Sequence, residues 1–299
     1  MSHGFVVASP RSGTTFLMQS LAALRWFLAK SGELFPPHFP HLYTASASAE
    51  QRALLEHALF FQLETCLRYR QNGRLDAVVE LLRGHLGLTE FTHAIRHRRK
   101  LNGVVFKEPF LAFAPDLLLR TDPNSRIVYL TRDGRDSADS MVRSFGALAD
   151  RQLETTHSVE VMLGRRVGLL IVPWWVENGR EQDFLEASPY LRNVWMWKEM
   201  NRRCIASFFQ TDVEASQRVL WVRYEDLMLQ PKLTGQRIVT HLGGEWNANL
   251  ERRFQNASVK SVGIHKRRDS KEISAATTLA AEELNRLGYL NKSVNATAG

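Results

Sequence analysis

Short apolar runs alternate with longer stretches of helical periodicity along most of the chain. The runs that suit buried strands cover residues 4–8, 104–106, 127–130 and 219–223. Apolar residues recur at helical spacing in residues 14–30, 46–70, 77–86, 91–99, 114–120, 136–145, 190–209, 231–242 and 275–287. Strands that alternate with helices predict βαβ units. We therefore expect an α/β fold, with one domain over residues 1–299 and a central parallel sheet flanked by helices.

Two segments interrupt this alternation. Residues 31–43 contain Gly32 and three prolines, which predict an irregular loop. Residues 146–190 show no clear periodicity. Because long inserted segments of α/β enzymes often act as lids, we expect the insertions 31–100 and 146–190 to lie near a second substrate.

The composition suits one large core with a positively charged surface. The 299 residues are 44% hydrophobic and carry a formal charge of +8. Such a charge fits nucleic acid, an anionic membrane or a phosphorylated ligand. The basic residues are spread along the chain, with small clusters at 96–100 and 266–268, which argues against nucleic acid. The apolar stretch 167–176 is shorter than the roughly 20 residues that span a bilayer, so we expect no membrane span.

The cysteines bear on compartment and on metal binding. Cys66 and Cys204 lie far apart within helical patterns. This spacing indicates reduced thiols in a cytoplasmic protein rather than a disulfide framework, and it supports no metal site.

The segment from Ala8 to Thr15 reads A-S-P-R-S-G-T-T and joins the first strand to the first helix. Successive backbone N–H groups in such a loop can surround an anion at a helix N-terminus. The lysine of a nucleotide-triphosphatase loop is missing at Thr14, and the third strand leads into Thr131 without a carboxylate for Mg²⁺. The loop favours an anion held by Arg11 and hydroxyls without a metal; the alternative is a plain turn in which Ser and Thr cap the helix.

A second candidate anion site follows the third strand. Arg132 lies at the strand's end and Ser140 lies eight residues later, in the next helix. One phosphate beyond the carboxyl end of the strand could touch both side chains. The alternative is a surface arginine that pairs with Asp136 or Asp139.

Together these motifs resemble the sulfotransferases that use 3′-phosphoadenosine 5′-phosphosulfate (PAPS). S-P-R-S-G-T-T resembles their 5′-phosphosulfate loop, Y-L-T-R-D-G-R-D-S-A-D-S their 3′-phosphate motif, and V-R-Y-E-D-L a strand that places a tyrosine near adenine. The resemblance implies a P-loop-like fold with helical insertions and PAPS as co-substrate, without a metal. The donor-binding residues that it implies are Arg11, Ser12, Gly13, Thr14 and Thr15 for the 5′-phosphosulfate, Arg132 and Ser140 for the 3′-phosphate, Tyr224 for adenine, and Arg267 and Arg268 closing over the 3′-phosphate.

The departures from the aryl-type members affect the expected catalytic residues. Those members usually have Lys in place of Arg11 and often His in place of Pro109, so the chain looks nearer to bacterial, tyrosylprotein or carbohydrate-type members. By this resemblance Arg11 would stabilise the bridging oxygen and Lys107 would bind a sulfuryl oxygen. Glu33 is the first candidate for the general base, and an exposed loop carboxylate is its alternative. Further candidates are Glu108, for which we favour an ion pair with Lys107 or another neighbouring cation, and then His38 or His41.

The acceptor is not readable from the motifs. We expect a hydroxyl or an amine of a small molecule, carbohydrate, lipid or peptide, and the sequence gives no oligomeric state. A P-loop kinase would share the opening strand, loop and helix, and a nucleotide- or RNA-binding module could use the basic surface without catalysis. The first predicts Mg²⁺-dependent use of ATP and the second predicts binding without turnover.

Overall fold

A single parallel sheet organises the computed structural model, which describes residues 2–24, 27–31, 103–121, 124–154, 164–209 and 217–290 and a few residues between 49 and 88. Its five strands lie in the order β2-β3-β1-β4-β7, and all neighbours are parallel. The bounds are Ser2–Val7 for β1, Phe27–Ser31 for β2, Gly103–Lys107 for β3, Arg126–Thr131 for β4 and Val219–Arg223 for β7. The predicted α/β fold with a parallel sheet is confirmed.

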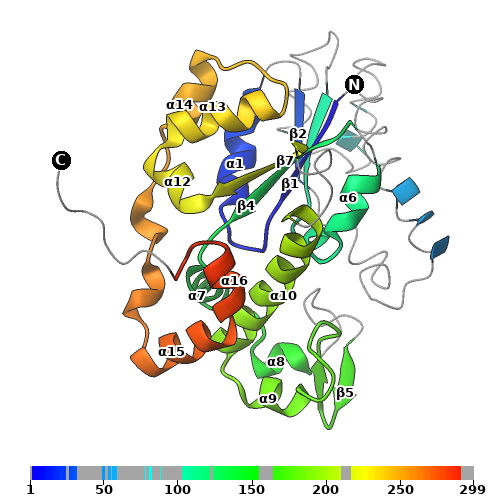
Figure 1. Ribbon diagram of the computed structural model, residues 1–299, viewed down its shortest axis with the longest axis vertical. Helices are drawn as coiled ribbons and strands as arrows, with labels where there is room; N and C mark the ends of the chain where they lie inside the picture. The colour runs from blue at the N-terminus through cyan, green and yellow to red at the C-terminus, as the bar shows by residue number, and fades with distance from the viewer. Residues whose placement is uncertain are drawn as a thin grey trace.

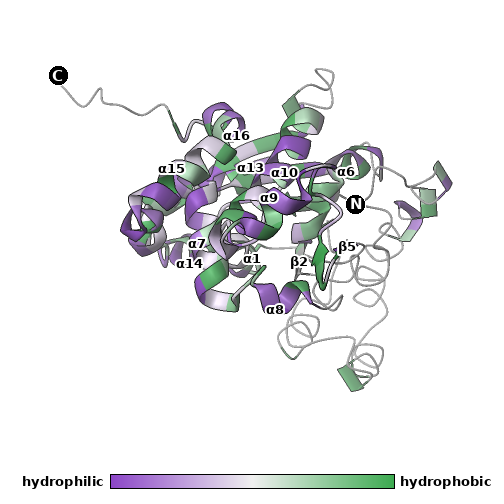
Figure 2. Cartoon of the chain, turned by 90° about the horizontal axis from the view of Figure 1, so that it is seen from below, coloured by the Kyte–Doolittle hydropathy of each residue, from purple (hydrophilic) through white to green (hydrophobic). Residues whose placement is uncertain are grey.

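Helices cover both faces of the sheet because alternate strand residues point to opposite sides (Figure 1). Phe5 and Phe106 join one core cluster with α10, whereas Val6 and Val105 join the other with α1. The helices of the first face are α6 (Pro115–Thr121), α7 (Gly134–Phe145) and α10 (Pro189–Phe209); those of the second are α1 (Thr14–Leu21), α12 (Tyr224–Leu229), α13 (Pro231–His241) and α14 (Ala248–Phe254). Hydrophilic and hydrophobic residues alternate along these covering helices (Figure 2).

The remaining elements lie outside the sheet. The insertion at 146–190 forms α8 (Asp150–Leu153), the antiparallel pair β5 (Arg165–Val167) and β6 (Leu170–Val172), and α9 (Glu181–Glu186). The chain closes with α15 (Ser270–Leu279) and α16 (Ala281–Arg286), and the short turns η2 (Pro109–Phe113), η3 (Val259–Ser261) and η4 (Ile264–Arg267) connect other elements.

The structure differs from the sequence-based expectation in two places. The helix predicted for 14–30 ends at Leu21, and its second half forms β2, an edge strand that pairs with β3. The helix predicted for 275–287 is two helices that meet at Ala280. The helices predicted between 46 and 99 lie largely outside the described residues.

The fold brings the predicted motifs to one edge of the sheet. Strands β1, β3, β4 and β7 are parallel neighbours, so their carboxyl ends point the same way. The first loop follows β1, Lys107 ends β3, Arg132 follows β4 and Tyr224 follows β7. This edge, where open α/β sheets bind ligands, is the candidate site.

Candidate functional site

The first loop turns sharply between β1 and α1. Arg11 and Gly13 both have left-handed backbones, with φ of 63° and 90°. Gly13 is the N-cap of α1, and no side chain caps the helix, so the Ser and Thr side chains of the loop are not spent on capping. The Ser9 and Ser12 hydroxyls lie 2.9 Å apart, and Ser12 and Thr14 are buried while Arg11 and Thr15 are exposed.

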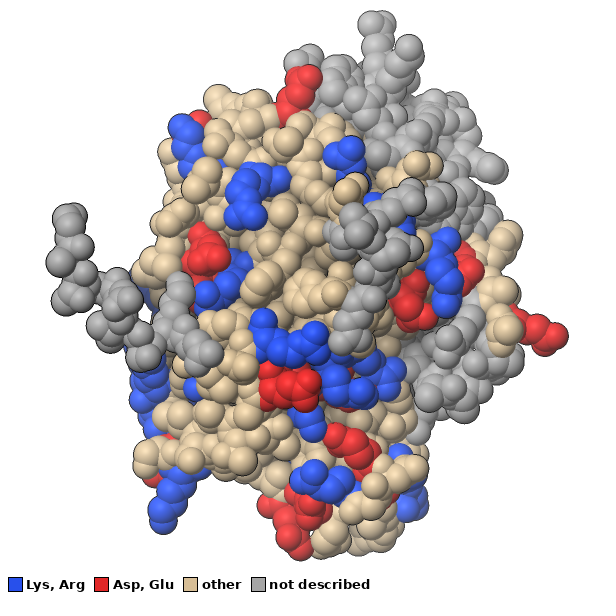
Figure 3. Space-filling view, in the orientation of Figure 1, with Lys and Arg blue, Asp and Glu red and all other residues tan. Residues whose placement is uncertain are grey.

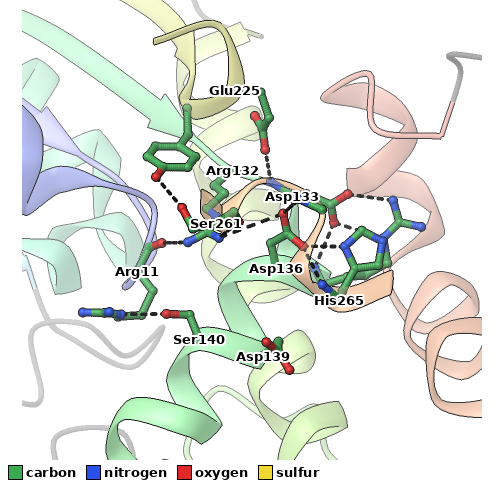
Figure 4. Close-up of polar contacts among 12 residues, drawn as sticks. Arg11, Arg132, Asp133, Asp136, Asp139, Ser140, Glu225, Ser261 and His265 are labelled. Atoms are coloured by element: carbon green, nitrogen blue, oxygen red, sulfur yellow. Dashed lines mark hydrogen bonds and ion pairs between the residues drawn. The ribbon is translucent and has the colours of Figure 1, made fainter. Parts of the chain in front are cut away.

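Arg132 is the central buried cation of the site, with 4% of its surface exposed. Its Nη1 donates to the carbonyl of Arg11 at 2.8 Å, its Nη2 donates to the carbonyl of Ser261, and its guanidinium lies 4.8 Å from the centre of the Tyr224 ring (Figure 4). The Nε of Arg132 is buried and has no hydrogen-bond partner among the described residues. Burying such a donor without a partner costs about 1–3 kcal/mol, so this atom favours an acceptor from a ligand.

Arg11 lies over α7, beside the second motif. Its Nε donates to the Ser140 hydroxyl at 3.0 Å and its Nη2 to the Ser144 hydroxyl at 3.4 Å, and its guanidinium lies 5.3 Å from the centre of the Phe145 ring. Partial burial and the positive charge of Arg132 lower the pKa of Arg11. The two arginines thus form a region of like charge that an anion would stabilise.

Tyr224 forms a wall of this region. Its ring lies so close to Gly13 that a Cβ there would be 2.3 Å from Cδ2, and its hydroxyl lies 2.7 Å from the Ser261 hydroxyl. Because the ring packs between Gly13 and Arg132, Tyr224 fixes the first loop against the second motif. Its predicted approach to adenine stays a prediction.

The start of α7 is held by α10, which covers the same face of the sheet. The Nε1 of Trp197 on α10 donates to the carbonyl of Arg132 at 3.0 Å, and the indole packs so closely on Gly134 that a Cβ there would lie 2.4 Å away. The Asp133 side chain caps the helix by accepting from the N–H of Arg135. The backbone that carries Arg132 is therefore fixed by its neighbours.

Residues 258–268, here called the C-terminal turn, close over the same helix. The Asp136 carboxylate accepts from the backbone N–H of Gly263 at 2.6 Å, from that of His265 at 2.9 Å, and from His265 Nδ1 at 2.5 Å (Figure 4). Burial alone would raise the pKa of Asp136, but these hydrogen bonds lower it below its ordinary value. Asp136 is therefore an anchor for the C-terminal turn; its separation of 4.0 Å from Arg132 makes it a weak partner of that cation.

The other predicted residues are less central in this structure. Lys107 is buried and pairs in register with Val6, one strand away from the first loop. Glu108 is buried and caps η2, and its carboxylate accepts from Phe110 N at 3.5 Å. Arg267 is exposed. Arg268 pairs with Asp139 and Glu272 and lies over Tyr190, and the base candidates Glu33, His38 and His41 lie outside the described residues.

Sequence reasoning missed three contributors: Ser261, His265 and Trp197. Each contacts the second motif from a distant part of the chain: Ser261 lies 129 positions after Arg132 in the sequence, and Trp197 lies 65 positions after it. The G-I-H sequence at 263–265 carries no familiar spacing. The nearest feature that the sequence analysis singled out is the basic run 266–268, whose Arg267 and Arg268 stay predicted ligands of the 3′-phosphate.

On the face in Figure 3 the described basic and acidic side chains are interspersed, with a group of basic side chains near the middle. Within the described ranges, no cluster of three or more His, Cys, Asp and Glu is placed to hold a metal ion, and no helix is long and apolar enough to cross a bilayer. Cys204 is a buried free thiol whose pKa is raised by burial.

Solved structures to which the chain is similar include two sulfotransferase domains and a retinol dehydratase. The sulfotransferase domain of the Synechococcus PCC 7002 olefin synthase is 15% identical, with 100% of this chain and 90% of that chain covered and a TM-score of 0.47. The sulfotransferase domain of the curacin biosynthetic pathway is 18% identical, with 96% of this chain and 97% of that chain covered and a TM-score of 0.49. A retinol dehydratase in complex with androsterone and the inactive cofactor PAP is 14% identical, with 99% of this chain and 82% of that chain covered and a TM-score of 0.38.

The family itself is shown by the sequence. No curated protein matches the chain. The profile of the sulfotransferase family matches residues 5–167, more than half of the 299 residues. The matched region runs from β1 to the end of β5 and contains the first loop, Lys107, Arg132 and Ser140. The family predicted from the motifs is confirmed, and the chain belongs to the sulfotransferase family.

Proposed function

We propose that this protein transfers the sulfuryl group of PAPS to a hydroxyl or amine acceptor, without a metal ion, within one domain over residues 1–299. The observation that carries the proposal is the buried Nε of Arg132, a donor without a partner among the described residues, beside a second cation, Arg11. A nucleotide with anions at its 3′ and 5′ positions would supply negative charge to both. Because Arg132 is 4% exposed, we expect Arg11 or the C-terminal turn to move when the donor enters.

The roles proposed for the binding residues follow from their positions. Ser12, Gly13, Thr14 and Thr15 would hold the 5′-phosphosulfate at the N-terminus of α1. Arg132 and Ser140 would hold the 3′-phosphate, while Tyr224 and Arg267 with Arg268 would border the adenine and the 3′-phosphate. Arg11 now donates to Ser140, so its guanidinium must leave that hydroxyl to reach the sulfuryl group. That movement would leave the hydroxyl to the 3′-phosphate.

PAPS supplies the sulfuryl group and a leaving phosphate when it is bound. The protein's part is positioning and charge stabilisation, as in phosphoryl transfer with attacking and leaving oxygens in line. Arg11 would stabilise the charge that develops on the leaving side, and Lys107, at the end of the neighbouring strand, would bind an equatorial oxygen. Removing one such donor typically lowers the rate by about 100-fold or more.

The acceptor needs a base to take its proton. Glu33 is the first candidate and Glu108 the second. Since Glu108 is buried and its carboxylate accepts from the N–H of Phe110, its position favours a structural role. The insertions 31–100 and 146–190 would border the acceptor, which could be a small molecule, a carbohydrate, a lipid or a peptide.

Transfer of labelled sulfate from PAPS tests this function. Purified protein is screened against phenols, sugars, peptides and lipid alcohols, and we expect turnover on at least one class. Glu33→Gln should lower kcat by about 100-fold or more with little change in donor affinity; Glu108→Gln is its matched comparison. Binding of the donor without transfer on any class would favour a non-catalytic nucleotide-binding module, and Mg²⁺-dependent use of ATP would favour a kinase.

A further inference from the structure

The C-terminal turn, residues 258–268, joins the parts of the proposed donor site. Ser261 accepts from Arg132 through its carbonyl and lies 2.7 Å from the Tyr224 hydroxyl through its own hydroxyl. Gly263 and His265 donate to Asp136, in the first turn of α7. The turn therefore contacts both Arg132, at the end of β4, and the first turn of α7.

Asp136 has two possible partners. Its Oδ1 and Oδ2 lie 2.5–2.9 Å from the three donors of Gly263 and His265, whereas Oδ2 lies 4.0 Å from Arg132 Nη2. Both Asp136 and Arg132 are almost fully buried, with exposed fractions of 1% and 4%. Opposite charges interact more strongly in such surroundings than in water, so a small rotation of Asp136 would pair it with Arg132. That ion pair would neutralise the charge on which 3′-phosphate binding depends.

We propose that His265 is a positioning residue which holds the Asp136 carboxylate away from Arg132 and so keeps the charge of Arg132 available to the 3′-phosphate. Of the three hydrogen bonds that Asp136 accepts from Gly263 and His265, the one from His265 Nδ1 comes from a side chain. The two backbone N–H donors remain whatever residue stands at 265. This inference rests on the proposed function, because it assigns Arg132 to the 3′-phosphate.

Removal of the imidazole donor tests the inference. We expect His265→Leu to lower the affinity for 3′,5′-adenosine bisphosphate by about tenfold, because one hydrogen bond to a charged group is lost. The affinity for 5′-AMP, which has no 3′-phosphate, should change less than about twofold. His265→Asn keeps a donor close to the position of Nδ1 and should restore the affinity to within about threefold of wild type.

A second substitution separates this role from a merely structural one. Asn at position 136 cannot neutralise Arg132, so Asp136→Asn added to His265→Leu should recover bisphosphate affinity although the C-terminal turn has lost a further charged contact. If His265 only stabilises the fold, the double variant will bind the bisphosphate more weakly than His265→Leu does. Thr277→Val is the matched control, because it removes the hydrogen bond from Arg135 to α15 and one within α15 without touching the C-terminal turn, and we expect wild-type affinity.

The measurement is isothermal titration of each variant with both nucleotides, after circular dichroism has shown that it folds. His265→Phe, which fills the space without a donor, replaces His265→Leu if the leucine variant does not fold. Equal losses for the two nucleotides, or no recovery in the double variant, would overturn the role of His265. A wild-type protein that binds bisphosphate no better than 5′-AMP would instead refute the proposed donor site.

Discussion

Gly13 is the position of the first loop where a side chain should be most harmful. Its φ is +90°, and a Cβ would lie 2.3 Å from Cδ2 and 2.5 Å from Cε2 of Tyr224. In Gly13→Ala the ring would have to move by about 1 Å, from 2.3 Å to the 3.4 Å at which ordinary contacts begin. The displaced ring would lose its contacts with Arg132 and Ser261.

The cost can be worked from three effects. A left-handed backbone costs a residue other than glycine roughly 1–2 kcal/mol. Overpacking adds about 1–3 kcal/mol, and the hydrogen bond between Tyr224 and Ser261 is worth about 1 kcal/mol. Gly13→Ala should therefore lower the free energy of unfolding by about 3–6 kcal/mol, against a typical total of about 5–15 kcal/mol.

Gly179→Ala is the matched control for this prediction. Gly179 also has a left-handed backbone, with φ of +82°, but nothing lies within 4 Å of its added Cβ. Only the backbone strain remains, and urea unfolding should show a loss of about 1–2 kcal/mol. Tyr224→Ala in the Gly13→Ala background removes the clash, so the double variant should lose less stability than the sum of the two single losses. Equal losses in Gly13→Ala and Gly179→Ala would refute the packing of Tyr224 against the loop.

Three further predictions concern acid stability, the support of α7 and metal dependence. Hydrogen bonds lower the pKa of Asp136 below its ordinary value of 3.8, so the stability that this carboxylate contributes is present above about pH 4 and is lost as the pH falls through the folded-state pKa. At pH 7 Asp136→Asn should therefore unfold at a lower urea concentration than wild type. Its urea midpoint should also depend less on pH in acid. Trp197→Phe leaves the Arg132 carbonyl without its donor and should cost about 1–3 kcal/mol in urea unfolding, and an unchanged midpoint would contradict the support of α7. Dialysis against EDTA should leave sulfate transfer unchanged, whereas a loss that Mg²⁺ restores would contradict a metal-independent mechanism.

The three central strands β1, β3 and β4 were predictable because burial on both sides makes each one a short continuous apolar run, and the edge strand β7 was predicted from the apolar run 219–223. The edge strand β2 was not, since residues 27–31 continue an apolar pattern that fits a helix equally well. Pairing with β3, more than 70 residues later, selects the strand. The break at Ala280 likewise leaves no mark in the periodicity.

The site was predictable where it depends on strand ends and local spacing. Arg11, Arg132 and Tyr224 each follow a parallel strand, so the topology brings them to one edge. The partners of these residues were not predictable, because Ser261, His265 and Trp197 reach the site only through tertiary packing. The family resemblance implied Arg268 as a ligand of the 3′-phosphate; in this structure Asp139 and Glu272 pair with its guanidinium, and the role stays a prediction.

The central claim is that Arg132 belongs to a pocket for the 3′-phosphate of an adenine nucleotide whose 5′ end lies at the first loop. Titration of wild type and Arg132→Ala with 3′,5′-adenosine bisphosphate and with 5′-AMP, without metal, tests it most directly. We predict that wild type prefers the bisphosphate and that Arg132→Ala loses most of this preference while its affinity for 5′-AMP falls far less. Equal losses for both nucleotides, or a wild type that does not distinguish them, would contradict the claim.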